Sequence, residues 1–278
     1  MKFPQKNAYD FQDLCQIVAD LRSPQGCAWD RAQTKEDLIQ YVMEEAYEVI
    51  DAIRKQDMAG LQEELGDLCI QIVFLAQIAA EQGAFTMDDV CDGVVKKMLF
   101  RHPHVFGSDE ETLTKEQVPD TWEAQKQKEK QYKSITEQME SVPASMPALL
   151  RAYKVQAKAA KVGFDWPDAA AMLDKIKEET QELEAEVYCQ DEEDNGNNGK
   201  ISEELGDLML VLSNFSRFFA LNPEIVLTNA IEKFINRFRE VERMAVAKGI
   251  DMKSADLEAL NKLWRSAKQE VIDKQTLY

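Results

Sequence analysis

Apolar residues recur at helical spacing along most of this chain, whereas the two-residue alternation of strands is nearly absent. Each apolar stripe faces a polar side, which is the pattern of a helix that packs on one face. The predicted helices span residues 10–21, 34–54, 58–82, 86–100, 116–133, 169–188 and 223–248. Glycine and proline are sparse within these segments. The pattern therefore predicts an all-α protein.

The same six residues, Glu-Glu-Leu-Gly-Asp-Leu, lead into two long apolar runs, 68–80 and 208–219, and the last leucine of each hexapeptide is the first residue of its run. These hexapeptides occupy 63–68 and 203–208. Each follows a second acidic cluster with the spacing Glu-Glu-x-x-Glu, at residues 44–48 in one case and 178–182 in the other. The order of acidic clusters and apolar run is thus repeated in the chain.

Carboxylates three residues apart share a helix face, so Glu45 stacks on Glu48 and Glu64 on Asp67. Two antiparallel helices would converge these four groups on one spot, where a hard cation would relieve their repulsion. The alternative is a solvated helix face. However, Asp67 and Asp207 each directly precede a run that is apolar on nearly all sides, as expected of a buried helix, where an unpaired charge is costly. The predicted ligands of two Mg²⁺ sites, with Mn²⁺ as a substitute, are Glu45, Glu48, Glu64 and Asp67, and Glu179, Glu182, Glu204 and Asp207.

The repeat extends beyond the acidic clusters. Lys97 and Arg101 align with Lys233 and Arg237, and Trp122 and Lys126 align with Trp264 and Lys268. These matches in the same order indicate an internal duplication. We therefore expect an N-terminal domain (1–126), a charged linker (127–147) and a C-terminal domain (148–278).

Lysine and arginine four residues apart lie on one helix face, with a spacing that suits phosphate oxygens, although such pairs commonly face solvent. Tryptophan offers a ring for a nucleotide base, or plain packing. The candidate substrate-binding residues are Lys97, Arg101, Trp122, Lys126, Lys200, Lys233, Arg237, Trp264 and Lys268. His102 and His104 have no counterpart in the second half and are interpreted as structural.

The halves differ, because Lys200 lies four residues before Glu204, whereas Gly60 occupies the matching position. We expect the second half to be the main catalytic unit. The acidic segment 191–199 resembles a cation site, but its asparagines and glycines favour a solvated loop.

The net charge of −18 disfavours partners that require a basic surface, namely nucleic acid and anionic membrane. The five cysteines lack Cys-x-x-Cys spacing, which argues against zinc and disulfide frameworks. The N-terminus shows no signal-peptide pattern, and the run 68–80 is too short to span a bilayer. We expect a cytoplasmic protein.

The acidic motifs resemble those of the MazG family of nucleoside triphosphate pyrophosphohydrolases, in its two-domain bacterial form. Supporting segments are 27–30, 101–107 and 162–166. The resemblance implies duplicated bundles of the all-α NTP pyrophosphatase type and a homodimer whose two chains build each site. It also implies Mg²⁺-dependent cleavage of nucleoside triphosphates to monophosphate and pyrophosphate, in nucleotide-pool control or house-cleaning. Glu178 and Glu44, beside the ligands, are candidates to orient or deprotonate the attacking water.

Two alternatives remain at this point. One is a pyrophosphohydrolase for a single nucleotide, similar to dUTPases or to enzymes that hydrolyse phosphoribosyl-ATP. The other is a non-catalytic helical regulator that binds a nucleotide or a protein. Two intact carboxylate quartets favour an enzyme.

Overall fold

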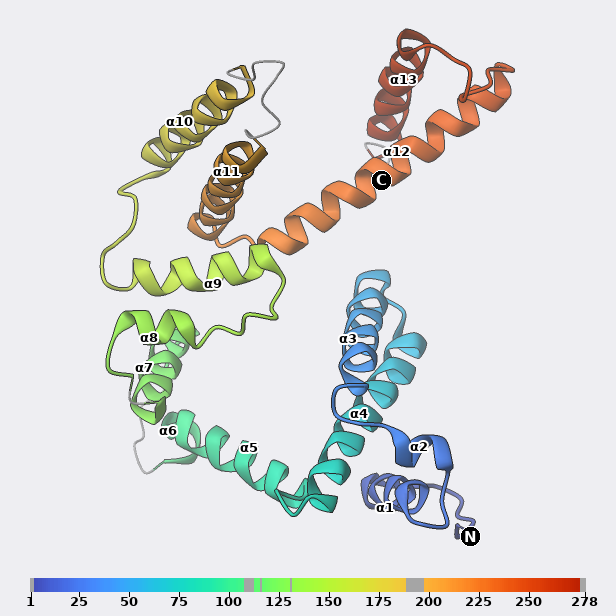
Figure 1. The fold of residues 1–278 in the computed structure, drawn as a ribbon, viewed down its shortest axis with the longest axis vertical. Helices are drawn as coiled ribbons and strands as arrows, with labels where there is room; N and C mark the ends of the chain where they lie inside the picture. Colours follow the sequence, from blue (N-terminus) through green and yellow to red (C-terminus); the bar gives the residue numbers. More distant parts are fainter. Residues whose placement is uncertain (1–2, 108–112, 116, 131, 189–197, 276–278) are drawn as a thin grey trace. The chain divides into compact units, whose positions relative to one another are not determined.

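The computed structural model describes residues 3–107, 113–115, 117–130, 132–188 and 198–275. Within these ranges the regular secondary structure is entirely helical (Figure 1), which confirms the all-α prediction. The chain divides into two compact units, residues 1–130 and 131–278. Most of the acidic segment 191–199 lies outside the described residues.

The first unit is built around an antiparallel hairpin of α3 and α4. Helix α1 packs against α4, and α5 leads from the end of α4 to α7, which packs against α5. The helices are α1 (Phe11–Arg22), α2 (Ala28–Ala32), α3 (Leu38–Lys55), α4 (Met58–Glu81), α5 (Met87–Arg101), α6 (Pro103–Phe106) and α7 (Val118–Lys130).

The second unit repeats this plan. Helices α10 and α11 form a hairpin, α9 packs against α11, and α13 packs against α12. The helices are α8 (Ile135–Glu140), α9 (Ala148–Ala160), α10 (Ala169–Tyr188), α11 (Asn198–Phe218), α12 (Pro223–Ala247) and α13 (Leu257–Gln275). The predicted linker 127–147 contains α8, which packs against α9.

Short polar residues fix the beginnings of several helices. Thr86 and Asp89 form the reciprocal bonds of a capping box at α5, as their spacing predicts. Asn222 caps α12 by accepting from two backbone N–H groups. The predicted start at Thr34 differs, because Thr34 and Asp37 bond to each other across a turn and α3 begins at Leu38.

The core of the first unit lies between α1, α3 and α4. Its buried residues are Val18, Leu38, Val73, Phe74 and Ile78. The apolar run 68–80 supplies three of these five residues, so this run is a core segment, as predicted. At about 25 cal/mol per Å² of apolar surface, each such side chain stabilises the fold by roughly 1.5–3 kcal/mol.

The second apolar run, 208–219, behaves differently. Val211 is buried, but Met209 and Leu212 remain exposed. The expectation that this run is buried on nearly all sides is therefore wrong for a single chain. The physical reason is that α9 and α10 cover only part of the circumference of α11.

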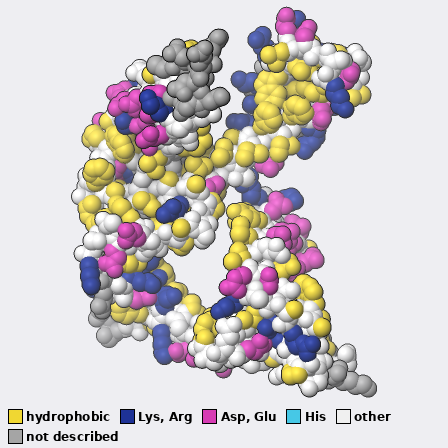
Figure 2. All heavy atoms as spheres, in the orientation of Figure 1, with side chains coloured by type: hydrophobic (Ala, Val, Ile, Leu, Met, Phe, Trp, Pro, Cys, Tyr) yellow, Lys and Arg dark blue, Asp and Glu magenta, His cyan; other side chains and the backbone are white. Residues whose placement is uncertain are grey.

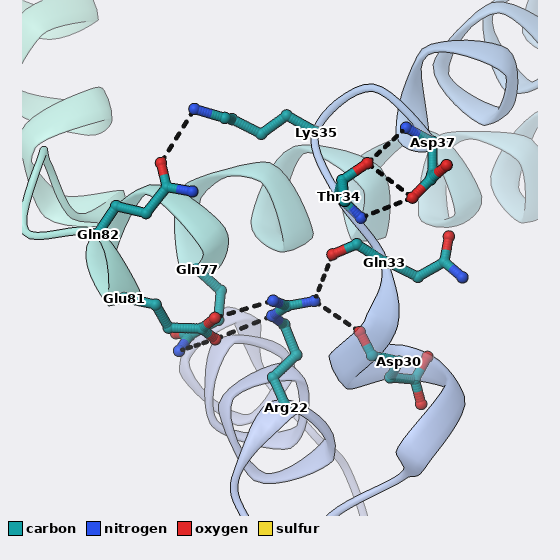
Figure 3. A network of polar contacts seen from close by, with 9 residues as sticks. All are labelled: Arg22, Asp30, Gln33, Thr34, Lys35, Asp37, Gln77, Glu81 and Gln82. Atoms are coloured by element: carbon teal, nitrogen blue, oxygen red, sulfur yellow. Dashed lines mark hydrogen bonds and ion pairs between the residues drawn. The ribbon is translucent and has the colours of Figure 1, made fainter.

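Arg22 is the polar centre of the first unit (Figure 3). Its guanidinium donates to both carboxylate oxygens of Glu81, at 2.9 and 2.8 Å, and to the backbone carbonyls of Asp30 and Gln33, at 2.6 and 3.1 Å. Its side chain is only 6% exposed. One arginine therefore joins α1, α4 and the segment around α2, because its rigid fork offers several donors at once.

We expect Arg22→Met to lower the free energy of unfolding by about 3 kcal/mol, because the partly buried Glu81 carboxylate loses its cation and two carbonyls lose a charged donor. Urea denaturation of the full chain measures this loss. The control is Lys96→Met, which removes an exposed ion pair with Asp92 and is expected to cost below about 0.5 kcal/mol. Equal losses for both variants would contradict this role for Arg22.

Within the described part of the chain, no helix has the length and apolarity needed to cross a membrane.

Candidate metal centre

In the first half, the α3–α4 hairpin brings three of the predicted ligands together. Glu45 and Glu48 lie one turn apart on α3, and Glu64 lies on the facing helix α4. One carboxylate oxygen from each is within 4.8 Å of the others. Helices α3 and α4 lie close together because only Gln56 and Asp57 connect them, with Gln56 in the left-handed conformation.

In the second half, the α10–α11 hairpin gathers Glu179, Glu204 and Asp207 within the same 4.8 Å limit. Glu179 is the most buried of these carboxylates, at 5% exposure. Glu204 and Asp207 lie three residues apart on α11, so they present to one face.

The remaining predicted ligands, Asp67 and Glu182, lie outside these two close groups of three. Each is nevertheless near its own cluster. The charge of Asp67 contributes to raising the pKa of Glu45, and that of Glu182 contributes to raising the pKa of Glu204. The structure thus gathers three carboxylates closely in each half and keeps the fourth within electrostatic range.

Burial, and then the charges of neighbouring carboxylates, raise the pKa of carboxyl groups in both clusters. For Glu64 the largest cause is burial, followed by the charge of Glu48 and a hydrogen bond between the two groups. For Glu204 it is again burial, then the charges of Glu182 and Asp207. Both causes disfavour the ionised form, and a bound cation would oppose them.

Lys175 is a cluster residue that the sequence analysis missed. Its Nζ lies 2.8 Å from Glu178 Oε1 and 2.9 Å from Glu179 Oε1. These two contacts raise the pKa of Lys175 above its ordinary value, so the amine stays charged. The available signal was its position four residues before Glu179, on the same helix face. The matching position in the first half is Tyr41.

Lys200, the other cation expected near the second cluster, lies on the first turn of α11. Its Nζ is 3.7 Å from Glu186 on α10, and its side chain is largely exposed. The structure therefore places Lys200 beside a carboxylate that is not among the predicted ligands. The candidate catalytic residues Glu44 and Glu178 both lie at exposed positions.

In the first half, the predicted substrate-binding cations lie on α5 and α7. Arg101 is buried, binds Glu129 and lies over the ring of Trp122, with 5.1 Å between the guanidinium carbon and the ring centroid. Lys97 lies one turn before Arg101 on α5, and Lys126 one turn after Trp122 on α7.

In the second half, the corresponding residues lie on α12 and α13. The rings of Phe234 and Trp264 are 5.1 Å apart. Arg237 has a buried Nε without a hydrogen-bond partner among the described residues. Lys233 and Lys268 lie on the same two helices. The structure thus places these cations on the α12–α13 pair and the carboxylates on the α10–α11 pair.

The donor set fits a hard divalent cation. Each cluster offers only carboxylate oxygens, and their mutual separations suit ligands of one ion. Histidine and thiolate, which zinc prefers, do not contribute to either cluster.

The sequence profile described as the "MazG nucleotide pyrophosphohydrolase domain" matches residues 33–106 and 168–242. The chain belongs to the MazG family. Both matched segments contain an acidic hairpin, so the family domain occurs twice and the predicted duplication is confirmed.

Relatives in this family cover nearly the whole chain. The "Nucleoside triphosphate pyrophosphohydrolase" of Escherichia coli (strain K12) is 41% identical over 94% of this chain and 97% of its own length. The "Nucleoside triphosphate pyrophosphohydrolase/pyrophosphatase MazG" of Thermotoga maritima is 40% identical over 93% and 95%. A solved structure of a MazG-related protein from Thermotoga maritima covers 42% of this chain and 98% of its own, at 28% identity and a TM-score of 0.36.

We expect a divalent cation to stabilise the fold in a pH-dependent way. A carboxyl group whose pKa is raised by folding favours the folded state at low pH, and this contribution is lost as the pH rises through the folded-state pKa. Ionised, uncompensated clusters therefore destabilise the chain near neutral pH, where bound Mg²⁺ would oppose the effect.

The expected gain in melting temperature with MgCl₂ is roughly 3 °C or more near pH 7 and close to zero near pH 4. Thermal unfolding with MgCl₂ or with EDTA measures it. The double variant Glu64→Gln/Glu204→Gln should lose most of the gain, whereas a pH-independent gain would contradict a carboxylate site.

Proposed function

We propose that this protein hydrolyses nucleoside triphosphates to nucleoside monophosphates and pyrophosphate, with Mg²⁺ as cofactor and Mn²⁺ as a substitute. The observation that carries the proposal is the Glu179, Glu204 and Asp207 cluster, which has a lysine beside it. The names of the two full-length relatives support this reaction. Control or cleaning of nucleotide pools is the role that we infer from it.

Glu179, Glu182, Glu204 and Asp207 would hold the metal in the second half. When bound, a divalent cation neutralises triphosphate oxygens and lowers the pKa of a coordinated water. Glu178 adjoins Glu179 in sequence and is exposed, and Lys175 engages its Oε1. Once that amine moves to phosphate, the Glu178 carboxylate would orient or accept a proton from the water that attacks the α-phosphorus. Glu44 is its first-half counterpart.

The cations would bind the polyphosphate. The Lys175 amine lies against Glu178 and Glu179. When a triphosphate is bound, this amine would move from the two carboxylates to the phosphate oxygens. Lys233, Arg237 and Lys268 would neutralise the charge that develops on the pyrophosphate leaving group. Trp264, beside Phe234, offers an aromatic surface for the nucleotide base.

A homodimer is part of the proposal, and the α12 surface supports it. The exposed apolar residues of this helix recur at intervals of three and four, which forms one stripe. Figure 2 shows hydrophobic side chains gathered over the α12–α13 pair. The stripe comprises Leu227, Ile231, Phe234, Ile235 and Phe238. A continuous apolar stripe of this kind marks an interaction surface, and a second copy with the same stripe is its natural occupant.

A second copy would also complete the site. Carboxylates lie on the α10–α11 pair and the phosphate-binding cations on the α12–α13 pair. Association of two copies would bring one chain's cations to the other chain's metal cluster. This arrangement gives a reason for the apolar side chains that α11 and α12 leave exposed.

The second half is proposed as the main catalytic unit. We expect Glu204→Gln to lower kcat/KM by at least roughly 100-fold, because it removes a metal ligand. Glu64→Gln, the matched change in the first half, should leave more than about half of the activity. Comparable losses would rule out the asymmetry.

The assay for both variants follows pyrophosphate and nucleoside monophosphate released from a panel of NTPs and dNTPs, with Mg²⁺ or EDTA. Equal amounts of both products establish cleavage between the α- and β-phosphorus atoms. Orthophosphate alone would mean that a different bond is cut. Nucleotide binding without turnover would favour the non-catalytic regulator, and turnover of one nucleotide alone would favour the specialised enzyme.

We expect Lys175→Met to separate metal binding from turnover. Removal of the amine frees Glu178 and Glu179, so half-activation should need less Mg²⁺, while kcat/KM falls roughly 10-fold or more because a phosphate contact is lost. Lys177→Met, which removes an exposed ion pair with Asp174, is the control. Loss of activity with a higher Mg²⁺ requirement would contradict this role.

A further inference from the structure

Arg101 is buried, and two of its guanidinium nitrogens are bound by a carboxylate of its own chain. Its Nε and Nη2 donate to the same oxygen of Glu129, at 2.8 and 2.6 Å, and its guanidinium lies over Trp122. The Arg101 side chain is 9% exposed and that of Glu129 is 29% exposed, so the pair is shielded from water on its arginine side. Charge-assisted bonds in such surroundings are stronger than those on an open surface.

A second cation of the first half, Lys97, lies within electrostatic range of the same carboxylate. The hydrogen bond from Arg101 is the largest cause that lowers the pKa of Glu129, and the charge of Lys97 adds to it. The His102 ring meets the Trp122 ring edge-on, with 4.9 Å between the ring centroids. We call Lys97, Arg101 and Trp122 the first-half cation cluster. The anion that this cluster holds is Glu129.

The second-half cation cluster, defined as Lys233, Arg237 and Trp264, lacks this partner. Trp264 packs against Phe234, and the Arg237 Nε is buried without a hydrogen-bond partner among the described residues. In sequence, Glu129 lies seven residues after Trp122, and the position seven residues after Trp264 is Val271. The duplicated clusters therefore differ in one acidic residue.

We propose that Glu129 is a built-in anion that occupies the first-half cation cluster and prevents it from binding the polyphosphate of a nucleotide. This inference rests on the proposed function and assigns a cause to the unequal halves. The Nε and Nη2 of Arg101, which would bind phosphate, already donate to a carboxylate. A phosphate next to Glu129 would add anionic repulsion to the cost of breaking an ion pair whose arginine is buried. In the second half, the buried Arg237 Nε has no hydrogen-bond partner among the described residues, so a phosphate oxygen that reached it would displace no existing acceptor.

The test uses the full-length chain and the Mg²⁺ complex of an α,β-methylene analogue of ATP, which cannot be hydrolysed between those phosphorus atoms. Calorimetry gives the affinity and the number of nucleotides bound per chain. Arg237→Ala weakens the second-half site and provides the background. Two changes are made in this Arg237→Ala background. Glu129→Val introduces the residue found at the matching position of the second half, Val271, and Glu129→Gln keeps the side-chain size but removes the charge.

We expect wild type to bind one nucleotide per chain, and Arg237→Ala to weaken binding at least roughly 10-fold. Adding Glu129→Val or Glu129→Gln should restore binding at least roughly 10-fold, because Arg101 is then free to pair with phosphate. A further Lys97→Ala should remove the restored binding. The control Asp92→Val also removes one negative charge from α5, away from Arg101, and should restore nothing.

Two results would overturn the proposal. One is two equivalent nucleotides per wild-type chain, because the first half would then bind despite Glu129. The other is no gain in affinity from either Glu129 variant. Because Glu129→Val leaves Arg101 without its ion-pair partner, thermal unfolding checks that both variants are folded. If the valine variant is unfolded, the binding measured for Glu129→Gln decides the test. Failure of the proposed function is separate: wild type would then release no pyrophosphate.

Discussion

Mutual repulsion among carboxylates on facing helices is the constraint on which the rest of this structure depends. Each hairpin places three of them within 4.8 Å of one another, in surroundings that raise the pKa values of Glu64 and Glu204. Two packed helices hold this arrangement because apolar contacts elsewhere in each unit offset its cost. In the first unit, the buried residues of α1, α3 and α4 supply those contacts.

The two halves differ in the cations that lie near their carboxylates. In the second half, Lys175 lies against Glu179 and compensates part of the negative charge. The first half has Tyr41 at the matching position, and its buried arginine is engaged by Glu129 instead. A duplicated hairpin thus keeps its acidic pattern in both copies, whereas its cations have taken on different partners. This difference concerns a few side chains and leaves the helical plan of both copies unchanged.

The apolar side chains that α11 and α12 expose are connected with the metal site through the proposed dimer. Helices α11 and α12 both leave large apolar side chains open in the single chain, among them Leu212 and Phe234. Such side chains are common singly on protein surfaces, but a stripe along one helix is not. The proposed dimer would cover the stripe and complete the metal site in one step. Stability and activity would then both depend on association.

The sequence by itself determined the all-α class, the duplication and the acidic residues that meet in each hairpin. Helical periodicity and short-range capping are local, so the α5 capping box at Thr86 and the facing of Glu45 and Glu48 follow from spacing alone. The start of α3 was misjudged by four residues, because the bonds between Thr34 and Asp37 stabilise a turn as well as a helix end.

Only the tertiary structure decided which charges pair across helices. The contact of Arg101 with Glu129 joins residues 28 apart, and that of Arg22 with Glu81 joins residues 59 apart. Periodicity gives the face of each helix, but not which helix packs against it. The exposure of the run 208–219 has the same origin, because burial depends on how many neighbours surround a helix. Long-range packing therefore determined the partners of the cations, whereas local spacing had already placed the carboxylates.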